Sequence, residues 1–136
     1  MGTLNLEVVT PDKVLVSQEV DTVVAPGSEG EFGLLPGHVH FLSGIVPGEL
    51  RFSAGNERVS LAVTNGFAEV SNDNVSVLVD AAERASDIDI DRAQQASERA
   101  KKRLEKERGT EGIDIARAQA ALQRSLVRIS VAKKSM

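Results

Sequence analysis

The amino-acid usage of the chain changes abruptly near residue 86, and this change limits the folds that are open to it. All four prolines, all four phenylalanines and nine of the eleven glycines come before that point. The first part has twelve acidic and four basic side chains, a net charge of −8, whereas the second has eight acidic and twelve basic side chains, a net charge of +4. In a chain of 136 residues, this predicts one full domain followed by a smaller unit of a different class.

Short runs of alternating apolar and polar residues dominate the first part. Leu4 and Leu6 would lie on one face of a strand, with Asn5 and Glu7 on the other. Turn residues separate the runs, and no helical pattern lies between them. Such strands are expected to pair antiparallel and to stack as two sheets or a flattened barrel, so residues 1–84 are predicted to form a β-sandwich. The predicted strands are 3–9, 14–20, 22–25, 49–52, 58–64, 66–70 and 75–79.

Residues 26–40 form a glycine-rich stretch that fits neither an ordinary strand nor an ordinary turn. It lacks the Gly-Lys-Ser/Thr ending of a phosphate-binding loop, and no predicted helix follows it. We therefore expect a tight loop whose glycines adopt positive φ angles and allow close approach of the backbone. His38 and His40 would share one face of a strand, but the chain has no further histidine and no cysteine to complete a metal site, so no metal is predicted.

From residue 87 onward, Ala, Gln, Glu, Lys and Arg replace the glycines and predict helix. A turn is expected at 108–112, and Asp87 or Asp89, and then Asp114, are suitable N-caps. Residues 87–136 are therefore predicted to form an antiparallel helical hairpin. Because one apolar stripe is mostly alanine, little area would be buried, and we expect a mobile hairpin. The stripes are Ala93, Ala96, Ala100 and Leu104, and Ile115, Ala118, Leu122, Leu126 and Ile129.

The two predicted helices repeat one pattern, since residues 88–94 recur at 113–119. Each helix carries three arginines spaced seven and four residues apart, which places them on one face. One interpretation is a solvated face, and the other is a surface for an anionic partner, because the guanidinium fork binds carboxylate or phosphate. A negative net charge and the absence of Trp and Tyr argue against nucleic acid. The arginines are Arg92, Arg99 and Arg103, and Arg117, Arg124 and Arg128.

Several separate motifs, in the order in which they occur, resemble the epsilon subunits of bacterial F-type ATP synthases. They lie at residues 24–38, 47–51 and 65–70, and the resemblance continues through 81–85 into the predicted hairpin. It implies a flattened β-barrel or sandwich of about ten strands followed by two helices. It also implies a rotor subunit of a proton-translocating complex, peripheral to the cytoplasmic face of the bacterial plasma membrane. His40 stands where this family usually has proline.

The resemblance further implies partners and contact residues. The β-sandwich at 1–84 would couple the gamma subunit to the c ring, through Glu29, Glu31 and His38 at the ring. The hairpin at 87–136 would inhibit ATP hydrolysis when it extends into the alpha/beta catalytic head. Residues 88–93 match an Ile/Leu-Asp-x-x-Arg-Ala motif, which implies ATP as a regulatory ligand rather than a catalytic cofactor. The implied ATP contacts are Glu83, Ile88, Asp89, Arg92, Ala93, Arg99, Arg124 and Arg128.

Two alternatives stay open at this point. Asp89 would serve as an N-cap alone and Arg92 as a salt-bridge partner within the hairpin, without any nucleotide. The chain would alternatively be a non-enzymatic scaffold or adaptor whose basic hairpin binds an acidic protein. An enzyme is not expected, because no constellation of acid, base and nucleophile is present and cysteine is absent. No run approaches the ~18 apolar residues of a membrane span, and no signal peptide is apparent, so a cytosolic protein is expected.

Overall fold

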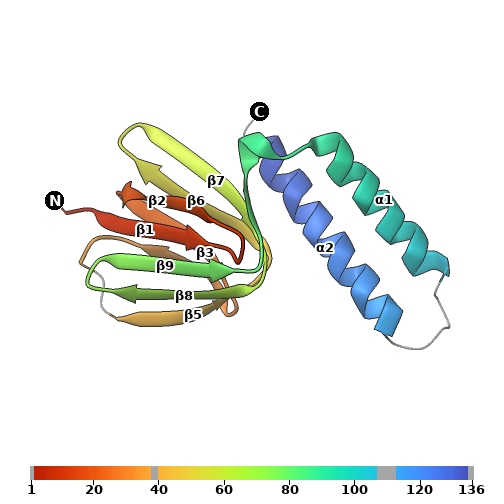
Figure 1. The fold of residues 1–136 in the computed structure, drawn as a ribbon, viewed down its shortest axis with the longest axis horizontal. Helices are drawn as coiled ribbons and strands as arrows, with labels where there is room; N and C mark the ends of the chain where they lie inside the picture. The colour runs from red at the N-terminus through yellow and green to blue at the C-terminus, as the bar shows by residue number, and fades with distance from the viewer. Residues whose placement is uncertain (1, 38–39, 107–112, 135–136) are drawn as a thin grey trace. The chain divides into compact units, whose positions relative to one another are not determined.

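The computed structural model describes residues 2–37, 40–106 and 113–134, and it divides after Arg84 into two compact units. Within those ranges the first unit contains ten β-strands and the second a short 3₁₀ helix and two α-helices (Figure 1). The predicted fold class, a ten-stranded sandwich followed by a helical hairpin, is confirmed. The strands are β1 (Leu4–Val9), β2 (Val14–Val20), β3 (Thr22–Gly27), β4 (Gly30–Leu34), β5 (Phe41–Ile45), β6 (Gly48–Ala54), β7 (Glu57–Val63), β8 (Gly66–Ser71), β9 (Asn74–Val79) and β10 (Ala82–Arg84).

The strands of the first unit form one continuous sheet that folds over itself. Their order is β10-β7-β6-β3-β5-β8-β9-β1-β2, with β4 paired to β3, and β5, β8, β9 and β1 lie side by side in Figure 1. The expectation of purely antiparallel pairing was wrong, because β1 runs parallel to β9, from Asn5 beside Asn74 to Val9 beside Leu78. Parallel strands need a long connection, and the seven strands between β1 and β9 supply it.

Alternation along the strands builds the core of the sandwich. In β1 the predicted inward side chains of Leu4, Leu6 and Val8 are at most 1% exposed. The same period of two buries one face of β9, where Val75, Val77 and Val79 point inward. The other buried members of this core are Val16, Val20, Val23, Ala25, Leu34, Ile45, Leu50, Phe52, Leu61, Val63, Ala68 and Val70.

The glycine-rich stretch contains a strand that the sequence did not predict. Residues 30–34 form β4, which pairs with β3 from Gly27 beside Gly30 to Val23 beside Leu34, so the expectation of a tight loop across this region was wrong. The expected glycine roles are present within the hairpin. Gly30 has a φ of 119°, and a Cβ on Gly27 would lie 2.7 Å from the Gly30 carbonyl oxygen and from the Phe32 ring. The glycines therefore permit a tight hairpin rather than prevent a strand.

Two further strands, β5 and β10, also escaped prediction. The strand β5 contains a serine and a glycine in five residues, and β10 is three residues long, so neither has a usable alternation. His40 precedes β5 and lies in no strand, contrary to the expected shared strand face, while His38 lies outside the described residues. Phe41, the first residue of β5, packs edge-on against Phe32 of β4 with ring centroids 5.1 Å apart.

The second unit begins with η1 (Ala85–Asp87) and continues with α1 (Ile90–Lys106) and α2 (Ile113–Lys134), which run side by side in opposite directions (Figure 1). Ala93, Ala100 and Ala118 are buried as the predicted stripes require, but Leu126 is 46% exposed. Two serines that the apolar pattern did not include, Ser97 and Ser125, are buried instead. The predicted turn at 108–112 and the side chain of Asp114 lie outside the described part of the structure.

Candidate functional site

The first turn of α1 carries the motif at 88–93, and its residues have definite local roles. The Asp89 Oδ1 accepts a hydrogen bond from the backbone N–H of Arg92 at 3.1 Å, and the Asp89 carbonyl accepts one from that of Ala93 at 3.0 Å. Asp89, rather than Asp87, is therefore the N-cap of α1. Ile88 and Ala93 are buried, so the apolar positions of the motif contribute to the interior.

A groove of about 820 Å³ runs between α1 and α2 within the second unit. Arg99 lines it together with Lys101, Lys102 and Lys133. Asp91 and Glu98 also line the groove, so four cationic side chains outnumber two acidic ones. An excess of guanidinium and ammonium groups suits an anionic ligand such as a phosphate or a carboxylate. The sequence predicted only Arg99, because Lys133 comes beside α1 through the antiparallel packing of the helices and no motif marks it.

A second hollow, of about 700 Å³, lies at the first turn of α1. Ile88 and Asp89 line it, and it shares Asp91, Gln94 and Lys133 with the groove. The two hollows therefore adjoin each other. Together they bring three of the eight predicted ATP contacts to neighbouring positions within one unit.

The remaining predicted ATP contacts are dispersed. Arg92 and Arg124 are exposed and Arg128 is half-buried, and none of them lines either hollow as the described residues form it. Ala93 is fully buried and offers no surface to a ligand. Glu83 lies in β10 and belongs to the first unit, whereas the motif belongs to the second.

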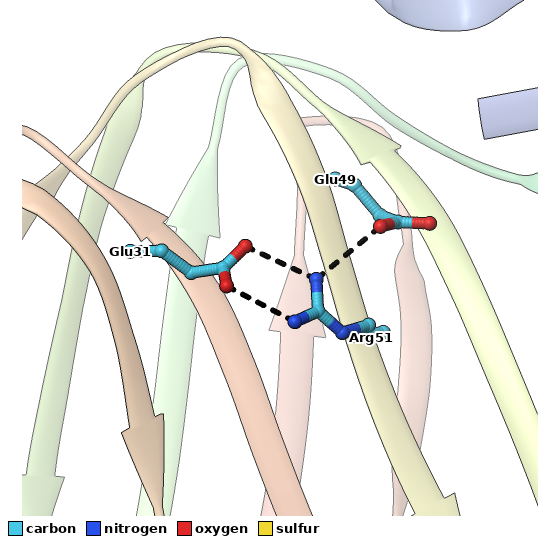
Figure 2. Close-up of polar contacts among 3 residues, drawn as sticks. All are labelled: Glu31, Glu49 and Arg51. Atoms are coloured by element: carbon cyan, nitrogen blue, oxygen red, sulfur yellow. Dashed lines mark hydrogen bonds and ion pairs between the residues drawn. The ribbon is translucent and has the colours of Figure 1, made fainter. Parts of the chain in front are cut away.

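Glu31, one of the predicted c-ring contacts, belongs to a charged cluster on the outer face of the sandwich (Figure 2). The Nη1 and Nη2 groups of Arg51 each donate to one Glu31 carboxylate oxygen at 3.0 Å, and Nη1 also donates to Glu49 Oε1 at 3.3 Å. The hydrogen bond to Glu31 raises the pKa of Arg51, although partial burial opposes this shift. The side chains of Arg51 and Glu31 are 43% and 54% exposed, so the ion pair adds little to the stability of the fold. Its main effect is to restrain the orientation of the two side chains.

The predicted c-ring contacts are spread along β4 rather than gathered in a single turn. Glu29 lies in the turn between β3 and β4, and Glu31 is the second residue of β4. Gly37 follows the far end of β4, where its backbone N–H donates to Asp73 Oδ1 at 2.7 Å. His38, which comes next, lies outside the described residues.

Asp73, which accepts this hydrogen bond from Gly37, belongs to the turn between β8 and β9. Asn72 and Asp73 adopt φ angles of 49° and 63°, the left-handed conformation that two-residue hairpin turns require. The Oγ of Ser71 lies 3.1 Å from the Nε2 of His40. The turn and the end of β8 therefore contact both Gly37, through Asp73, and His40, through Ser71.

A row of apolar side chains crosses the outer face of four neighbouring strands. Pairing places Phe67 of β8 beside Leu78 of β9, Leu78 beside Val9 of β1, and Val9 beside Val14 of β2. Phe67, Leu78 and Val14 are 47%, 42% and 57% exposed. We call these four residues the apolar row. In the adjacent β5, Gly44 lies opposite Phe67 and the exposed Leu42 lies opposite Glu69, so the row ends at β8. An apolar surface that crosses several strands is typical of a protein interface.

Two family models match the chain. The ATP synthase, Delta/Epsilon chain, beta-sandwich domain matches residues 3–85, and the ATP synthase, Delta/Epsilon chain, long alpha-helix domain matches residues 86–133. Among curated proteins, the ATP synthase epsilon chain of Nitratidesulfovibrio vulgaris (strain DP4) is 54% identical over 129 residues, which are 95% of each chain. That of Syntrophobacter fumaroxidans is 48% identical over 132 residues, which are 97% of each chain.

Solved structures show the same fold. A chain in the Euglena gracilis mitochondrial ATP synthase (OSCP/F1/c-ring, rotational state 1) has a TM-score of 0.80 at 20% identity and covers 98% of this chain and 80% of its own. One in the Tetrahymena thermophila central stalk/c-ring structure has a TM-score of 0.61 at 12% identity, with 98% and 96% covered. Neither helix, as far as it is described, has the length and apolar character that crossing a bilayer requires. Among the described residues, no group of three or more His, Cys, Asp or Glu side chains could hold a metal ion.

Proposed function

The chain belongs to the family of ATP synthase delta/epsilon chains, and we propose that it serves as a rotor subunit in the central stalk of a proton-translocating F-type ATP synthase. Its relatives are named epsilon chains, and it carries both family units in the family's order. It is a non-catalytic subunit that couples rotation of the gamma subunit and the c ring to ATP synthesis. In this role it is peripheral to the membrane, on the cytoplasmic face of the bacterial plasma membrane.

The apolar row is the observation that best supports coupling by the sandwich. Phe67 and Leu78 are the largest of its side chains, and both are more than 40% exposed on the outer face of the sheet. An aromatic and a branched apolar side chain side by side supply the kind of contact that dominates interface energetics. The gamma subunit is the partner proposed for this surface.

Replacing Phe67 and Leu78 by serine tests this assignment. The variant Phe67→Ser/Leu78→Ser is expected to bind the gamma subunit at least ten times more weakly, on the scale of about 2 kcal/mol for an interface anchor. Its free energy of unfolding should change little, because both side chains are exposed. The control is Leu35→Ser, which removes an apolar side chain that is 59% exposed away from the row. Equal affinity of the two variants for gamma would contradict the assignment.

Glu29 and Glu31 are proposed as contacts to the c ring. Both are exposed; Glu29 lies in the turn between β3 and β4, and Glu31 follows within β4. His38 is part of the same proposal on the basis of the resemblance alone, since it lies outside the described residues.

The hairpin is proposed to regulate the complex. In its folded form it binds ATP, and in its extended form its basic helices reach the alpha/beta catalytic head and inhibit hydrolysis. The cationic groove around Arg99 supports the nucleotide part, since phosphates favour guanidinium and ammonium groups. ATP then shifts the equilibrium toward the folded hairpin because it binds that form alone.

Calorimetric titration with ATP tests this regulation. Wild type is expected to bind ATP, and Arg99→Ala is expected to weaken binding by about tenfold, the loss typical of a charge-assisted hydrogen bond. The same loss is expected for Arg92→Ala on the basis of the motif match alone, since Arg92 lines neither hollow. Arg117→Ala is the matched control, because Arg117 occupies the position of Arg92 in the second copy of the repeat. No binding by wild type, or equal losses in all three variants, would exclude the proposed site.

A further inference from the structure

The charged cluster on the outer face of the sandwich has a defined geometry that the strand pairing imposes. Glu31 of β4 is opposite Pro26 of β3, and Arg51 of β6 is opposite Val24, so β4 and β6 flank β3 on either side. Pro26 and Val24 are two residues apart and share one face of β3. Glu31 and Arg51 therefore meet diagonally across β3, and their contact is set by the sheet rather than by flexible loops (Figure 2).

Glu49 fixes the position of the guanidinium from the other side. Glu49 and Arg51 are two residues apart in β6, which puts both side chains on the same face. The side chain of Glu49 is only 11% exposed, whereas that of Glu31 is 54% exposed. A carboxylate that is mostly removed from water is stabilised by a cation beside it. Glu49 therefore restrains the Arg51 guanidinium, and Arg51 in turn restrains the exposed carboxylate of Glu31.

We propose that Arg51 is a positioning residue that presents the Glu31 carboxylate, in one fixed orientation, to a cationic group on the partner subunit. The proposal rests on the proposed function, in which Glu31 contacts the c ring, and it adds the residues that prepare this contact and the charge of the group that meets it. The cluster contains two carboxylates and one guanidinium, and the side chain of Glu31 is the most exposed of the three. Electrostatic complementarity therefore favours a lysine or arginine opposite.

The planar fork of arginine is what makes this arrangement possible. Two parallel N–H groups engage the two oxygens of Glu31, which restrains both the direction and the plane of the carboxylate. A lysine at this position would keep the charge but would lose the bidentate contact. Preset orientation lowers the entropy that binding must overcome.

The proposal is tested by a double-mutant cycle on binding. Purified full-length chain is titrated onto ATP synthase complexes stripped of this subunit, and the dissociation constant is measured at low and high salt. Arg51→Met alone is expected to weaken binding about fivefold, a coupling of the size that contacting charged residues show. In a chain that already carries Glu31→Gln, Arg51→Met is expected to have no further effect on binding. Arg51→Lys should weaken binding nearly as much as Arg51→Met, and high salt should weaken wild type.

Folding and function are separated by further variants. Arg51→Met is expected to lower the melting temperature if removal of the guanidinium beside Glu49 destabilises the fold. In that case the double variant Arg51→Met/Glu49→Gln, which also removes the Glu49 charge, takes the place of Arg51→Met in the cycle. Equal effects of Arg51→Met with and without Glu31, or full binding by Arg51→Lys, would overturn the positioning role while leaving the proposed function intact. Failure of wild type to bind the complexes would instead overturn both.

Discussion

At the scale of single residues, Asp89 has two candidate roles, as the N-cap of α1 and as a contact to a nucleotide. Its carboxylate caps α1 by accepting the N–H of Arg92, and it also lines the hollow beside the groove. A cap needs only an acceptor oxygen, whereas a contact to a nucleotide depends on the charge or on the geometry of the whole carboxylate. The two roles can therefore be separated by substitution.

The variants Asp89→Ala and Asp89→Asn make this separation. Asp89→Ala is expected to destabilise the hairpin by about 1 kcal/mol, because the N-cap acceptor is lost. Asp89→Asn keeps an acceptor oxygen and should leave stability within a few tenths of a kcal/mol. Urea denaturation measures stability, and calorimetry measures ATP binding. Loss of ATP binding in Asp89→Asn at unchanged stability would assign a ligand role, and unchanged binding would leave Asp89 as a cap alone.

Asp73 is a second residue with a testable local role. Its φ of 63° and its hydrogen bond to the N–H of Gly37 make it both a turn residue and an anchor. Asp73→Ala removes the acceptor and also the short polar side chain that makes the left-handed conformation accessible to Asp and Asn, so a loss of about 2 kcal/mol is expected from denaturant unfolding. Asp73→Asn keeps both features and should be near neutral. Faster amide exchange at Gly37 in the alanine variant alone would locate the effect at the anchor.

At the scale of elements, alanines set the contact between α1 and α2. Ala93, Ala100 and Ala118 are at most 5% exposed. The distance between packed helices depends on the size of the side chains at the contact, and alanine is small. The alanine stripe of α1 was predictable, because apolar residues at helical spacing indicate the face that is buried. The burial of Ser97 and Ser125 was not predictable. Serine is small enough to fit between closely packed helices, but it is polar and therefore does not add to an apolar pattern.

Enlarging an interior alanine is expected to separate the helices. Ala93→Leu adds three carbon atoms at a position that is 0% exposed, so a loss of about 1–3 kcal/mol is expected from overpacking. Gln95→Leu adds a leucine at an exposed position of the same helix and serves as the control. The measurement is hydrogen exchange of the α2 amides. Equal protection in the two variants would show that α1 and α2 do not pack through Ala93.

The strand β4 is the element that was hardest to predict from the sequence. Glycines at 27, 30 and 33 suggested a loop, yet they allow β3 and β4 to meet at close range, and Glu31 and Arg51 meet only because of that hairpin. The apolar row was hidden for a different reason. A period of two places Phe67 on the outer face of β8 and Leu78 on the outer face of β9, but it does not show that the two side chains are neighbours, because that depends on the register between the strands.

At the scale of the whole molecule, the two units differ in what holds each together. The sandwich buries Leu, Val, Ile and Phe from the inner face of a folded sheet, whereas the described interior of the hairpin is mostly Ala with Ile88, Val131 and two serines. Burial of larger side chains removes more apolar area from water, at about 25 cal/mol per Å². The sandwich is therefore the more stable unit.

Hydrogen exchange monitored along the chain is expected to resolve the two units. Amides of α1 and α2 should exchange at lower opening free energy than those of β1, β8 and β9, because local stability follows local burial. ATP should raise the protection of the helices and leave that of the core strands unchanged, if it binds the folded hairpin alone. A single cooperative opening of the whole chain, with or without ATP, would contradict this division.

The sequence by itself determined the class of each unit and the place where one gives way to the other. Periodicity, helix propensity and the distribution of glycine, proline and charge are local properties, and they act through the backbone of the residues that carry them. The tertiary structure alone decided which side chains meet: Glu31 with Arg51 across β3, Lys133 beside α1, and Phe67 beside Leu78. These contacts join residues far apart in the chain through strand register and helix packing, which no local pattern encodes.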